Sequence, residues 1–327
     1  MSWTEDTLIA AMRDVLPVGR RTLVGSGDDC AVIAAPEKSY LVTTDILVDG
    51  RHFNRAWSAP SQIGRRAAAQ NLADIAGQGG IPTGLVVSLV VPSDLDIDWL
   101  IDVVRGFGAE VEPTGAGVVG GDLSSGDLFV ISVTAFGYAP YGSVLRSGAQ
   151  PGDVIAVAGT LGFSAAGWEL LDQGVAPSHL HTAEELGCWY PMVSVFRHPR
   201  PPLAAGVAAA RHGAHAMMDV SDGLSTDLAR MARSSRVNMD LHSNLLQHFV
   251  VPLEEAAQIT DSDPWDWILN GGEDHAMVAC FPADTVLPQP FKEIGTVSVL
   301  GEGYEPLVRF DGRTMTSGGW DHFTRTR

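Results

Sequence analysis

The chain has 327 residues, of which 45% are hydrophobic and 18% charged, and its formal net charge is −18. This composition is typical of a folded protein of about two domains and excludes a disordered chain. A surface this acidic repels nucleic acids and anionic membranes, so we expect neither as a partner. The longest apolar run, residues 85–91, is too short to span a bilayer, and the N-terminus lacks the pattern of a signal peptide.

Lysine and cysteine are both scarce. The only lysines are Lys38 and Lys292, which nearly excludes Schiff-base chemistry and a lysine-dependent phosphate loop. The three cysteines, Cys30, Cys188 and Cys280, are widely spaced and fit no zinc pattern. We therefore expect reduced thiols in a cytoplasmic protein.

Residues 1–140 are expected to form a first, α+β domain. Apolar spacing predicts helices over 3–16, 61–80 and 96–111, and strands at 31–34, 39–48, 84–91 and 128–137. A G-x-G-x-x-G pattern at 115–120 is not a dinucleotide site, because a helix and not a strand precedes it. We expect its glycines to let the end of a strand approach a ligand closely.

Residues 141–327 are expected to form a second domain after a linker at 138–142. The pattern predicts strands at 154–158, 267–272 and 275–281, a strand that delivers Asp219, and helices over 165–171, 203–212 and from 224 onward. A glycine-rich loop at 159–167 lacks the lysine ending of a phosphate-binding Walker loop.

Acidic residues recur where the apolar segments end. They lie at 25–31 (GSGDDCA), 43–45 (TTD), 71–74 (NLAD), 120–122 (GGD), 219–223 (DVSDG) and 271–274 (GGED). Neighbouring carboxylates repel each other unless a cation or solvent neutralises them. Any one of these stretches alone is more simply an exposed loop, but their repetition indicates a shared site for a hard cation.

Two of the acidic stretches carry specific expectations. Asp74 is expected on a helix face of small residues, where a carboxylate can approach another element closely. At 219–223 a strand delivers Asp219, and a turn presents Ser221 and Asp222 where a helix begins, so its free N–H groups favour anions. The alternative at this turn is that Ser221 or Asp222 only caps the helix.

Oxygen ligands in this number, without Cys or His spacing, favour Mg²⁺ over zinc. Magnesium usually binds a few carboxylates together with the phosphates of a substrate. Acidic loops, glycines and a helix start therefore suggest ATP and phosphoryl transfer, which depends on positioning and charge neutralisation.

Nine motifs then occur in the order in which they occur in thiamine-monophosphate kinases. They are GDDCAVI, TTDILVDGRHF, NLADIAGQGGIP, GGDL, RSGAQPGD, GTLGFSAAG, DVSDGL, GGEDH and GWDHF, and they extend from residue 27 to 323. The chain thus resembles this family, which belongs to the aminoimidazole ribonucleotide synthetase-like ATP-binding enzymes. The resemblance implies a two-domain α/β (α+β) fold of that type and a homodimer formed by the N-terminal sheet. It also implies ATP as co-substrate, several Mg²⁺ ions and thiamine monophosphate as acceptor.

The resemblance also implies roles for individual residues. The magnesium ligands would be Asp29, Thr43, Thr44, Asp45, Asp74, Asp122, Asp219 and Asp222. The ATP contacts would be Gly121, Asp122, Arg146 and Ser221, and the thiamine phosphate contacts His52, Glu273 and Trp320. The residues expected to act in catalysis are Asp74, Asp122, Arg146 and Asp222. Three places depart from the family pattern, namely Ala73, Arg65 or Arg66, and the pair His275-Ala276.

The expected reaction is in-line transfer of the γ-phosphoryl group of ATP onto the phosphate of thiamine monophosphate. The acceptor oxygen is already anionic, so the enzyme must offset the repulsion between two anions, which Mg²⁺ and Arg146 would do. Sibling enzymes fit less well, because selenophosphate synthetase-like members use an early cysteine with a nearby lysine and hydrogenase-maturation relatives end in a cysteine tail. Two functions of a different class stay open, a non-catalytic sensor of ATP or thiamine phosphates and an acidic structural protein that binds metal.

Overall fold

The structure is a computed structural model that describes residues 11–12, 14–24, 32–34, 39–301, 303–315 and 318–319. The chain divides by its internal contacts into two compact units. The first consists of Met1–Ile75 and Ile81–Ala139, and the second of Ala76–Gly80 and Pro140–Arg327. Each unit combines a sheet with helices, as expected of an α/β (α+β) chain.

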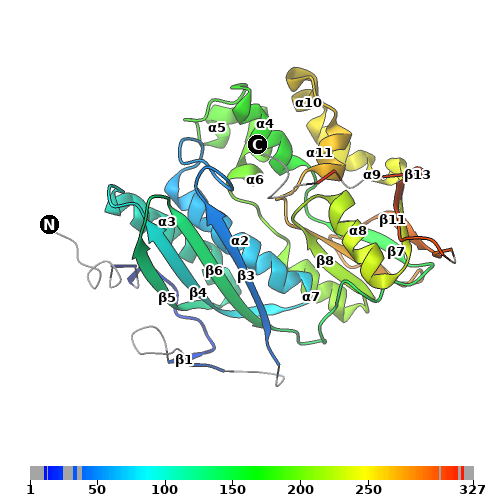
Figure 1. Cartoon of the computed structure of the whole chain (residues 1–327), viewed down its shortest axis with the longest axis horizontal. Coiled ribbons are helices and arrows are strands. Elements are labelled where there is room, and N and C mark those ends of the chain that lie inside the picture. The colour runs from blue at the N-terminus through cyan, green and yellow to red at the C-terminus, as the bar shows by residue number, and fades with distance from the viewer. Residues whose placement is uncertain are drawn as a thin grey trace. The chain divides into compact units, whose positions relative to one another are not determined.

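A four-stranded sheet forms the centre of the first unit (Figure 1). Its strands are β3 (Leu41–Val48), β4 (Ile81–Val91), β5 (Gly117–Ser125) and β6 (Val130–Tyr138), in the order β3-β6-β4-β5. Strand β6 is antiparallel to both of its neighbours, whereas β4 and β5 are parallel. A parallel pair needs a long crossover, which a helix provides here. Two short strands, β1 (Thr22–Val24) and β2 (Val32–Ile33), pair separately.

Helices α2 (Pro60–Gly77) and α3 (Ile97–Val111) pack on one face of this sheet. Helix α3 begins after Asp96, whose carboxylate accepts a hydrogen bond from the backbone N–H of Asp98. Side chains alternate along a strand, so every second residue of β6 faces the helices and is buried, including Ile131 and Val133. The hydrophobic core of the first unit therefore lies between the sheet and these two helices.

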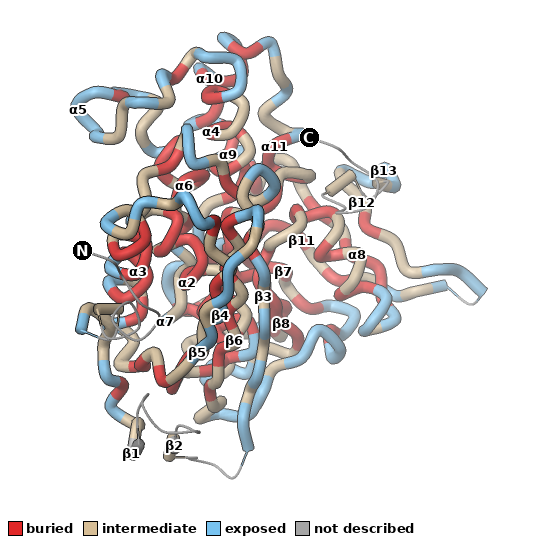
Figure 2. The backbone as a smooth tube through the Cα atoms, turned by 60° about the vertical axis from the view of Figure 1, so that its left-hand side comes forward, coloured by how far each residue is buried: buried red, intermediate tan, exposed pale blue. Residues whose placement is uncertain are grey.

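The opposite face of the same sheet has no helix of the first unit over it, as far as the described residues extend. On β3 the alternate residues Val42 and Ile46 are 60% and 52% exposed. Figure 2 shows β3 mostly in the colours of exposed and intermediate residues, while α2 is largely buried. Two large exposed aliphatic side chains on one strand face, separated only by Thr44, are unusual for a surface that stays in water.

A seven-stranded sheet forms the centre of the second unit, in the order β13-β12-β9-β11-β7-β10-β8. The strands are β7 (Val154–Ala158), β8 (Ala216–Val220), β9 (Asn238–Leu241), β10 (Ala276–Phe281), β11 (Lys292–Ser298), β12 (Val308–Phe310) and β13 (Arg313–Thr314). All neighbouring strands are antiparallel except β9 and β12. Strands β8 and β10 are buried along their whole length, as their nearly continuous apolar sequences require.

The helices of the second unit are short. They are α4 (Phe163–Asp172), α5 (Ala183–Leu186), α6 (Tyr190–Arg197), α7 (Leu203–Arg211), α8 (Leu224–Ser235), α9 (Ser243–Val250), α10 (Glu254–Thr260) and α11 (Pro264–Asn270). Single 3-10 turns lie at η3 (Gly187–Trp189) and η4 (Val251–Leu253) in this unit, and at η2 (Glu112–Thr114) in the first. No helix within the described residues is long and apolar enough to cross a membrane.

One expected element is wrong. The strand predicted at 267–272 is the end of helix α11, and Gly271 follows that helix. The carboxylate of Asp263 accepts a hydrogen bond from the N–H of Trp265 at 2.9 Å, and Pro264 occupies the first helical position. These two features at residues 263 and 264 favour a helix at this place. The apolar run alone does not, because a short apolar run fits a buried helix as well as a strand.

The other expected elements are present, with ends shifted by a few residues. Residues 3–10 of the first expected helix lie outside the described residues, and residues 11, 12 and 14 are helical. The glycines of the rejected dinucleotide pattern begin β5, so Gly121 and Asp122 lie within a strand and not at its end.

Candidate functional site

Two of the predicted site residues, Asp29 and Trp320, lie outside the described residues, as does the whole acidic stretch 25–31. Their roles stay predictions. All the other predicted site residues are described, some in the first unit and some in the second.

The first group joins strand β3 to helix α2. The hydroxyl of Thr43 donates a hydrogen bond to Oδ2 of Asp74 at 2.5 Å. Asp45 lies two residues after Thr43, so its side chain is on the same, helix-facing side of β3, as is that of the fully buried Leu47. The structure therefore brings together two of the predicted metal ligands, Thr43 and Asp74, and places Asp45 on the same side of the strand.

Asn71 adds an oxygen one helical turn before Asp74. Its side chain is fully buried, and its amide nitrogen donates to the carbonyl oxygen of Ala67 at 3.0 Å. That bond fixes which end of the amide is oxygen. The oxygen, Oδ1, has no hydrogen-bond partner within the described part of the chain. A buried acceptor without a donor is costly, so a water molecule or an ion at this place would relieve it.

These donors fit magnesium. All of them are oxygens, which Mg²⁺ prefers, and the ion ordinarily keeps several of its waters and binds only one or two carboxylates. No set of three or more His, Cys, Asp or Glu side chains stands in a metal-binding arrangement within the described residues. The group on β3 and α2 thus offers a partial coordination shell that substrate phosphates and water would complete.

Thr44 faces the other way. Its hydroxyl donates to the carbonyl oxygen of Val133 at 2.8 Å and accepts from the hydroxyl of Thr134 at 3.1 Å. Because successive side chains on a strand point to opposite faces, Thr44 lies on the face with Val42 and Ile46. Within this chain it does not join Thr43 and Asp74.

Asp122 also lies apart from the first group. It is exposed on β5. One residue on each strand forms a row across the sheet with it, namely Ser88 of β4, Ser132 of β6 and Ile46 of β3. This row belongs to the face of the sheet opposite α2. The strands β3 and β5 are also three strand spacings apart, roughly 14 Å. Asp122 therefore does not share an ion with Asp74 of the same chain.

The glycine before Asp122 has a packing role. A side chain at Gly121 would begin 1.9 Å from the carbonyl oxygen of Val87, so only glycine lets β5 lie against β4 at this register. The close approach at Gly121 is thus made to a neighbouring strand, and the approach of the glycines at 115–120 to a ligand stays a prediction. The contact of Gly121 with ATP stays a prediction.

His52 follows β3 in the turn that ends at Phe53. Its Nδ1 accepts a hydrogen bond from the N–H of Val48 at 3.0 Å. A ring nitrogen that accepts carries no proton, so the neutral ring has its proton on Nε2. The turn therefore fixes both the orientation of the ring and its tautomer.

The second group surrounds the turn after β8. Asp219 is 5% exposed, and its Oδ2 lies 2.9 Å from Nδ1 of His275. A carboxylate only accepts, so Nδ1 of the histidine donates this hydrogen bond. The backbone N–H groups of Glu273 and His275 donate to the carbonyl oxygens of Ser221 and Val220 at 2.8 and 3.1 Å. The two acidic motifs DVSDG and GGEDH thus lie side by side.

Neither predicted cap is present at this turn. Helix α8 has Gly223 at its N-cap position, without a side-chain hydrogen bond, so the capping alternative for Ser221 and Asp222 is wrong. The backbone N–H groups of Ser221 and Asp222 instead donate to Oδ2 of Asp227, at 3.0 and 2.9 Å. The carboxylate of Asp227 therefore takes the place at these two amides that an anion would need.

Arg230 completes this second group. Its guanidinium donates to Oδ2 of Asp222 at 2.5 Å and to Oδ1 of Asp227 at 2.7 Å. Asp227 is fully buried, and burial together with the charge of Asp219 raises its pKa to about 7. The guanidinium of Arg230 bridges Asp222 and Asp227, which offsets the repulsion between these two carboxylates.

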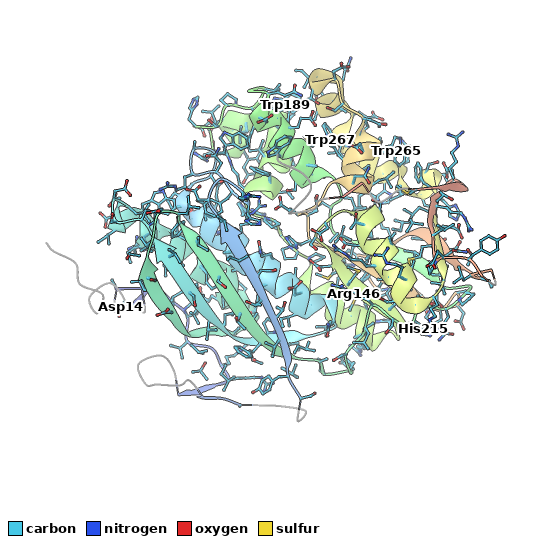
Figure 3. The ribbon with its side chains drawn as sticks, in the orientation of Figure 1. Asp14, Arg146, Trp189, His215, Trp265 and Trp267 are labelled. Atoms are coloured by element: carbon cyan, nitrogen blue, oxygen red, sulfur yellow. The ribbon has the colours of Figure 1, made fainter. Side chains whose placement is uncertain are left out.

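Arg146 lies at the opposite end of helix α8 from that turn (Figure 3). The residue is exposed, and its carbonyl oxygen accepts a hydrogen bond from Ser235 Oγ at 3.0 Å. Helix α8 has 12 residues and is therefore roughly 18 Å long. The backbone of Arg146 and the turn at Ser221 are thus separated by about the length of this helix.

Comparison with known proteins agrees with this arrangement. The N-terminal domain of AIR synthase related protein matches residues 27–139, and its C-terminal domain matches residues 150–302. The thiamine-monophosphate kinase of Mycobacterium tuberculosis is 41% identical over 322 residues, which cover 96% of this chain and 91% of that protein. The thiamine-monophosphate kinase of Corynebacterium glutamicum is 37% identical over 306 residues, covering 91% and 88%. The chain belongs to the thiamine-monophosphate kinase family of AIR synthase-related proteins.

The solved structures of this kinase family share the fold. The Aquifex aeolicus thiamine-monophosphate kinase complexed with AMPPCP and TMP superposes with a TM-score of 0.78 at 30% identity, covering 99% of both chains. The two-domain α/β fold expected from the resemblance is therefore confirmed.

Two members of the site were missed from the sequence, Asp227 and Arg230. Their signal is the spacing of three residues, which places an acid and an arginine on the same side of a helix. That spacing is common on exposed helices, so it does not by itself indicate a site. The structure shows its role, because Asp227 is buried and shares Arg230 with Asp222.

Asp274 of the GGEDH motif has a structural role in this kinase fold. It is 3% exposed, and its two oxygens accept hydrogen bonds from the N–H groups of Phe163 and Ser164, at 3.1 and 3.2 Å. These amides belong to the first turn of α4, whose unpaired N–H groups need acceptors. Asp274 therefore holds the start of α4 and is not placed for a metal or a phosphate.

The burial of Asp274 predicts a pH dependence of stability. Burial raises its pKa from 3.8 to about 6, against the opposing effect of hydrogen bonds that include one from Thr160. The folded chain then holds more protons than the unfolded chain between pH 4 and 6, so this group's stabilisation declines as the pH rises through that window. Relative to Asp274→Asn, which has no such proton, the wild-type free energy of unfolding should fall by ~2 kcal/mol from pH 4 to pH 7.

Urea unfolding of both proteins across that pH range tests this. The other carboxylates titrate in both proteins and cancel in the difference. A difference that does not vary with pH would mean that Asp274 keeps an ordinary pKa.

Proposed function

We propose that this chain catalyses the ATP-dependent phosphorylation of thiamine monophosphate to thiamine diphosphate, a step in thiamine diphosphate biosynthesis. The observation that carries the proposal is 41% identity to a thiamine-monophosphate kinase across 96% of the chain. The oxygen donors of Thr43, Asp45 and Asp74 support it from the structure, because phosphoryl transfer needs a metal site of this kind.

The residues of β3 and α2 would hold the metal. Mg²⁺, when bound, supplies positive charge to the phosphates of ATP. Asp45 and Asp74 would bind the ion, and the hydroxyl of Thr43 keeps the carboxylate of Asp74 in one orientation. Because the acceptor phosphate is already anionic, these residues need to align two anions and not to remove a proton.

The remaining predicted residues have roles that follow from their positions. Arg146 would bring its exposed guanidinium to the ATP phosphates, and Ser221 would contact ATP from the turn after β8. Asp219 and Asp222 would bind further magnesium ions. His52, Glu273 and Trp320 would contact thiamine monophosphate.

Incubation with ATP, Mg²⁺ and thiamine monophosphate, followed by chromatography, tests the reaction. Equal amounts of thiamine diphosphate and ADP are the expected result, and a chelator should abolish both. ADP with inorganic phosphate would indicate a hydrolase or another acceptor. Tight binding of both substrates without turnover would indicate the non-catalytic sensor.

We also propose a homodimer that forms through the exposed face of the four-stranded sheet. Val42 and Ile46 lie on this face, and burying them would contribute about 25 cal/mol per Å² of apolar surface. Thr44 and Asp122 lie on the same face, so a second copy would bring another set of these two predicted ligands to the interface. The cytoplasmic location stays a prediction, with which the free thiols of Cys188 and Cys280 agree.

The valine on this face provides a test. Val42→Glu should convert the dimer to a monomer of 34.7 kDa, because a charge would be buried without a partner at the interface. The control is Val286→Glu, since Val286 is 85% exposed and lies in the second unit. Light scattering after size-exclusion chromatography measures the mass. A dimer that survives Val42→Glu would rule out this face as the interface.

A further inference from the structure

The last residue of α8, Ser235, contacts the backbone of the loop that carries Arg146. Its hydroxyl donates to the carbonyl oxygen of Arg146 at 3.0 Å. It also accepts hydrogen bonds from the N–H groups of Gly148 and Ala149, both at 3.2 Å. A serine hydroxyl has one proton and two lone pairs, so all of its hydrogen-bonding capacity is used on this one loop.

The same loop is attached to strand β8 on its other side. The N–H of Met217 donates to the carbonyl oxygen of Leu145 at 3.0 Å. Gly148 has φ +131°, and a side chain there would begin 2.4 Å from the carbonyl oxygen of His215. The loop therefore runs closely along β8, which is the edge strand of its sheet. Figure 3 shows Arg146 and His215 at the same end of the unit.

Helix α8 connects this loop to the turn after β8. The helix begins at Leu224, directly after the turn with Ser221 and Asp222, and it ends at Ser235. A helix of 12 residues is a rigid spacer of roughly 18 Å. The two places in the second unit that are proposed to contact ATP are thus held by the two ends of one helix.

We propose that Ser235 is a positioning residue for Arg146 in the phosphoryl-transfer reaction. The inference rests on the proposed function, in which Arg146 contacts the phosphates of ATP. An arginine side chain is long and has many rotamers, so its accuracy depends on a backbone that does not move. Ser235 holds the carbonyl of Arg146 and the amides of Gly148 and Ala149, so the backbone from which the exposed guanidinium extends is held by three hydrogen bonds.

The decisive variant is Ser235→Ala, which removes all three hydrogen bonds. We expect the KM for ATP to rise about 10-fold, with a smaller change in kcat, in the KM for thiamine monophosphate and in Tm, because one positioned charge on ATP is disturbed. Ser235→Thr keeps the hydroxyl and should restore most of the affinity for ATP. The matched control is Ser234→Ala, an exposed serine one position earlier on the same helix, and it should leave the KM for ATP unchanged.

A double-mutant cycle with Arg146→Ala separates the role of Ser235 from that of Arg146. If Ser235 acts through Arg146, then Ser235→Ala has no further effect on the KM for ATP once the arginine is absent. Additive effects of the two substitutions, or a Ser235→Ala variant that behaves like Ser234→Ala, would overturn the role of Ser235 alone. An Arg146→Ala variant with a normal KM for ATP would instead contradict the proposed contact of Arg146 with ATP, and the positioning role of Ser235 with it.

Discussion

Replacing Asp74 by asparagine is expected to lower kcat by about 100-fold or more while the chain stays folded. Removing one preorganised electrostatic group from a transition state typically costs 10²- to 10³-fold in kcat. Asparagine keeps the size of the side chain, and its amide oxygen can still accept the hydrogen bond from Thr43. It lacks the negative charge that would bind Mg²⁺, so the loss should appear in catalysis and not in the free energy of unfolding.

The control for this substitution is Asp102→Asn. Asp102 lies on α3 of the same unit, and its side chain is 50% exposed in an ion pair with Arg105. Exposed pairs of this kind contribute little, so both kcat and stability should change little. Steady-state kinetics over a range of Mg²⁺ concentrations should also show a higher requirement for the metal in Asp74→Asn. Equal kcat values in the two variants would contradict the proposal of a metal site on β3 and α2.

The sequence predicted the elements of the site better than their arrangement. The alternation in β3 and the small-residue pattern around Asp74 are local features, so the meeting of a strand and a helix at these residues was accessible from the sequence. The placement of Asp122 was not, because it depends on the strand order β3-β6-β4-β5 and on the register between strands. Repeated acidic motifs therefore indicated one site, whereas Asp74 and Asp122 of the first unit lie on opposite sides of its sheet.

The acids of the second unit show a different limit. Asp222 follows an apolar strand and Asp274 follows two glycines, so both fit the acidic pattern. Asp222 pairs with Arg230, whereas Asp274 holds the start of α4. The partners are distant in the second case, since Phe163 lies more than a hundred residues away along the chain. No periodicity or spacing indicates a hydrogen bond of that kind. A motif can thus mark a functional region while one of its acids only supports the fold.

Replacing Arg197 by alanine is expected to destabilise the second unit by ~3–5 kcal/mol. Arg197 is the last residue of α6, and it is 1% exposed. Its guanidinium donates to the carbonyl oxygens of Leu180 and Ser178, at 2.6 and 2.8 Å. Alanine would leave a cavity and two carbonyl groups without their donors, which are two of the mechanisms that produce large losses.

The positive charge of Arg197 is stabilised by two backbone carbonyl groups and not by a carboxylate. No carboxylate forms an ion pair with it within the described residues, and its Nε has no hydrogen-bond partner there. Burial lowers its pKa to about 10, so it still keeps its proton at neutral pH. Burial and the positive charge of Arg197 also lower the pKa of His181, so a second positive charge in the same place is disfavoured.

The fork of the guanidinium is what the site requires, since it binds two carbonyl groups from one loop at once. Arg197→Lys keeps the charge but presents a single compact donor group, so it should recover only part of the stability lost in Arg197→Ala. Arg200→Ala is the control, because Arg200 is exposed three residues later. Urea unfolding measures the loss, and limited proteolysis of the loop at 174–182 should become faster in the alanine variant alone. If Arg197→Ala were as stable as Arg200→Ala, the loop would be held by its own packing and the buried guanidinium would contribute nothing to its stability.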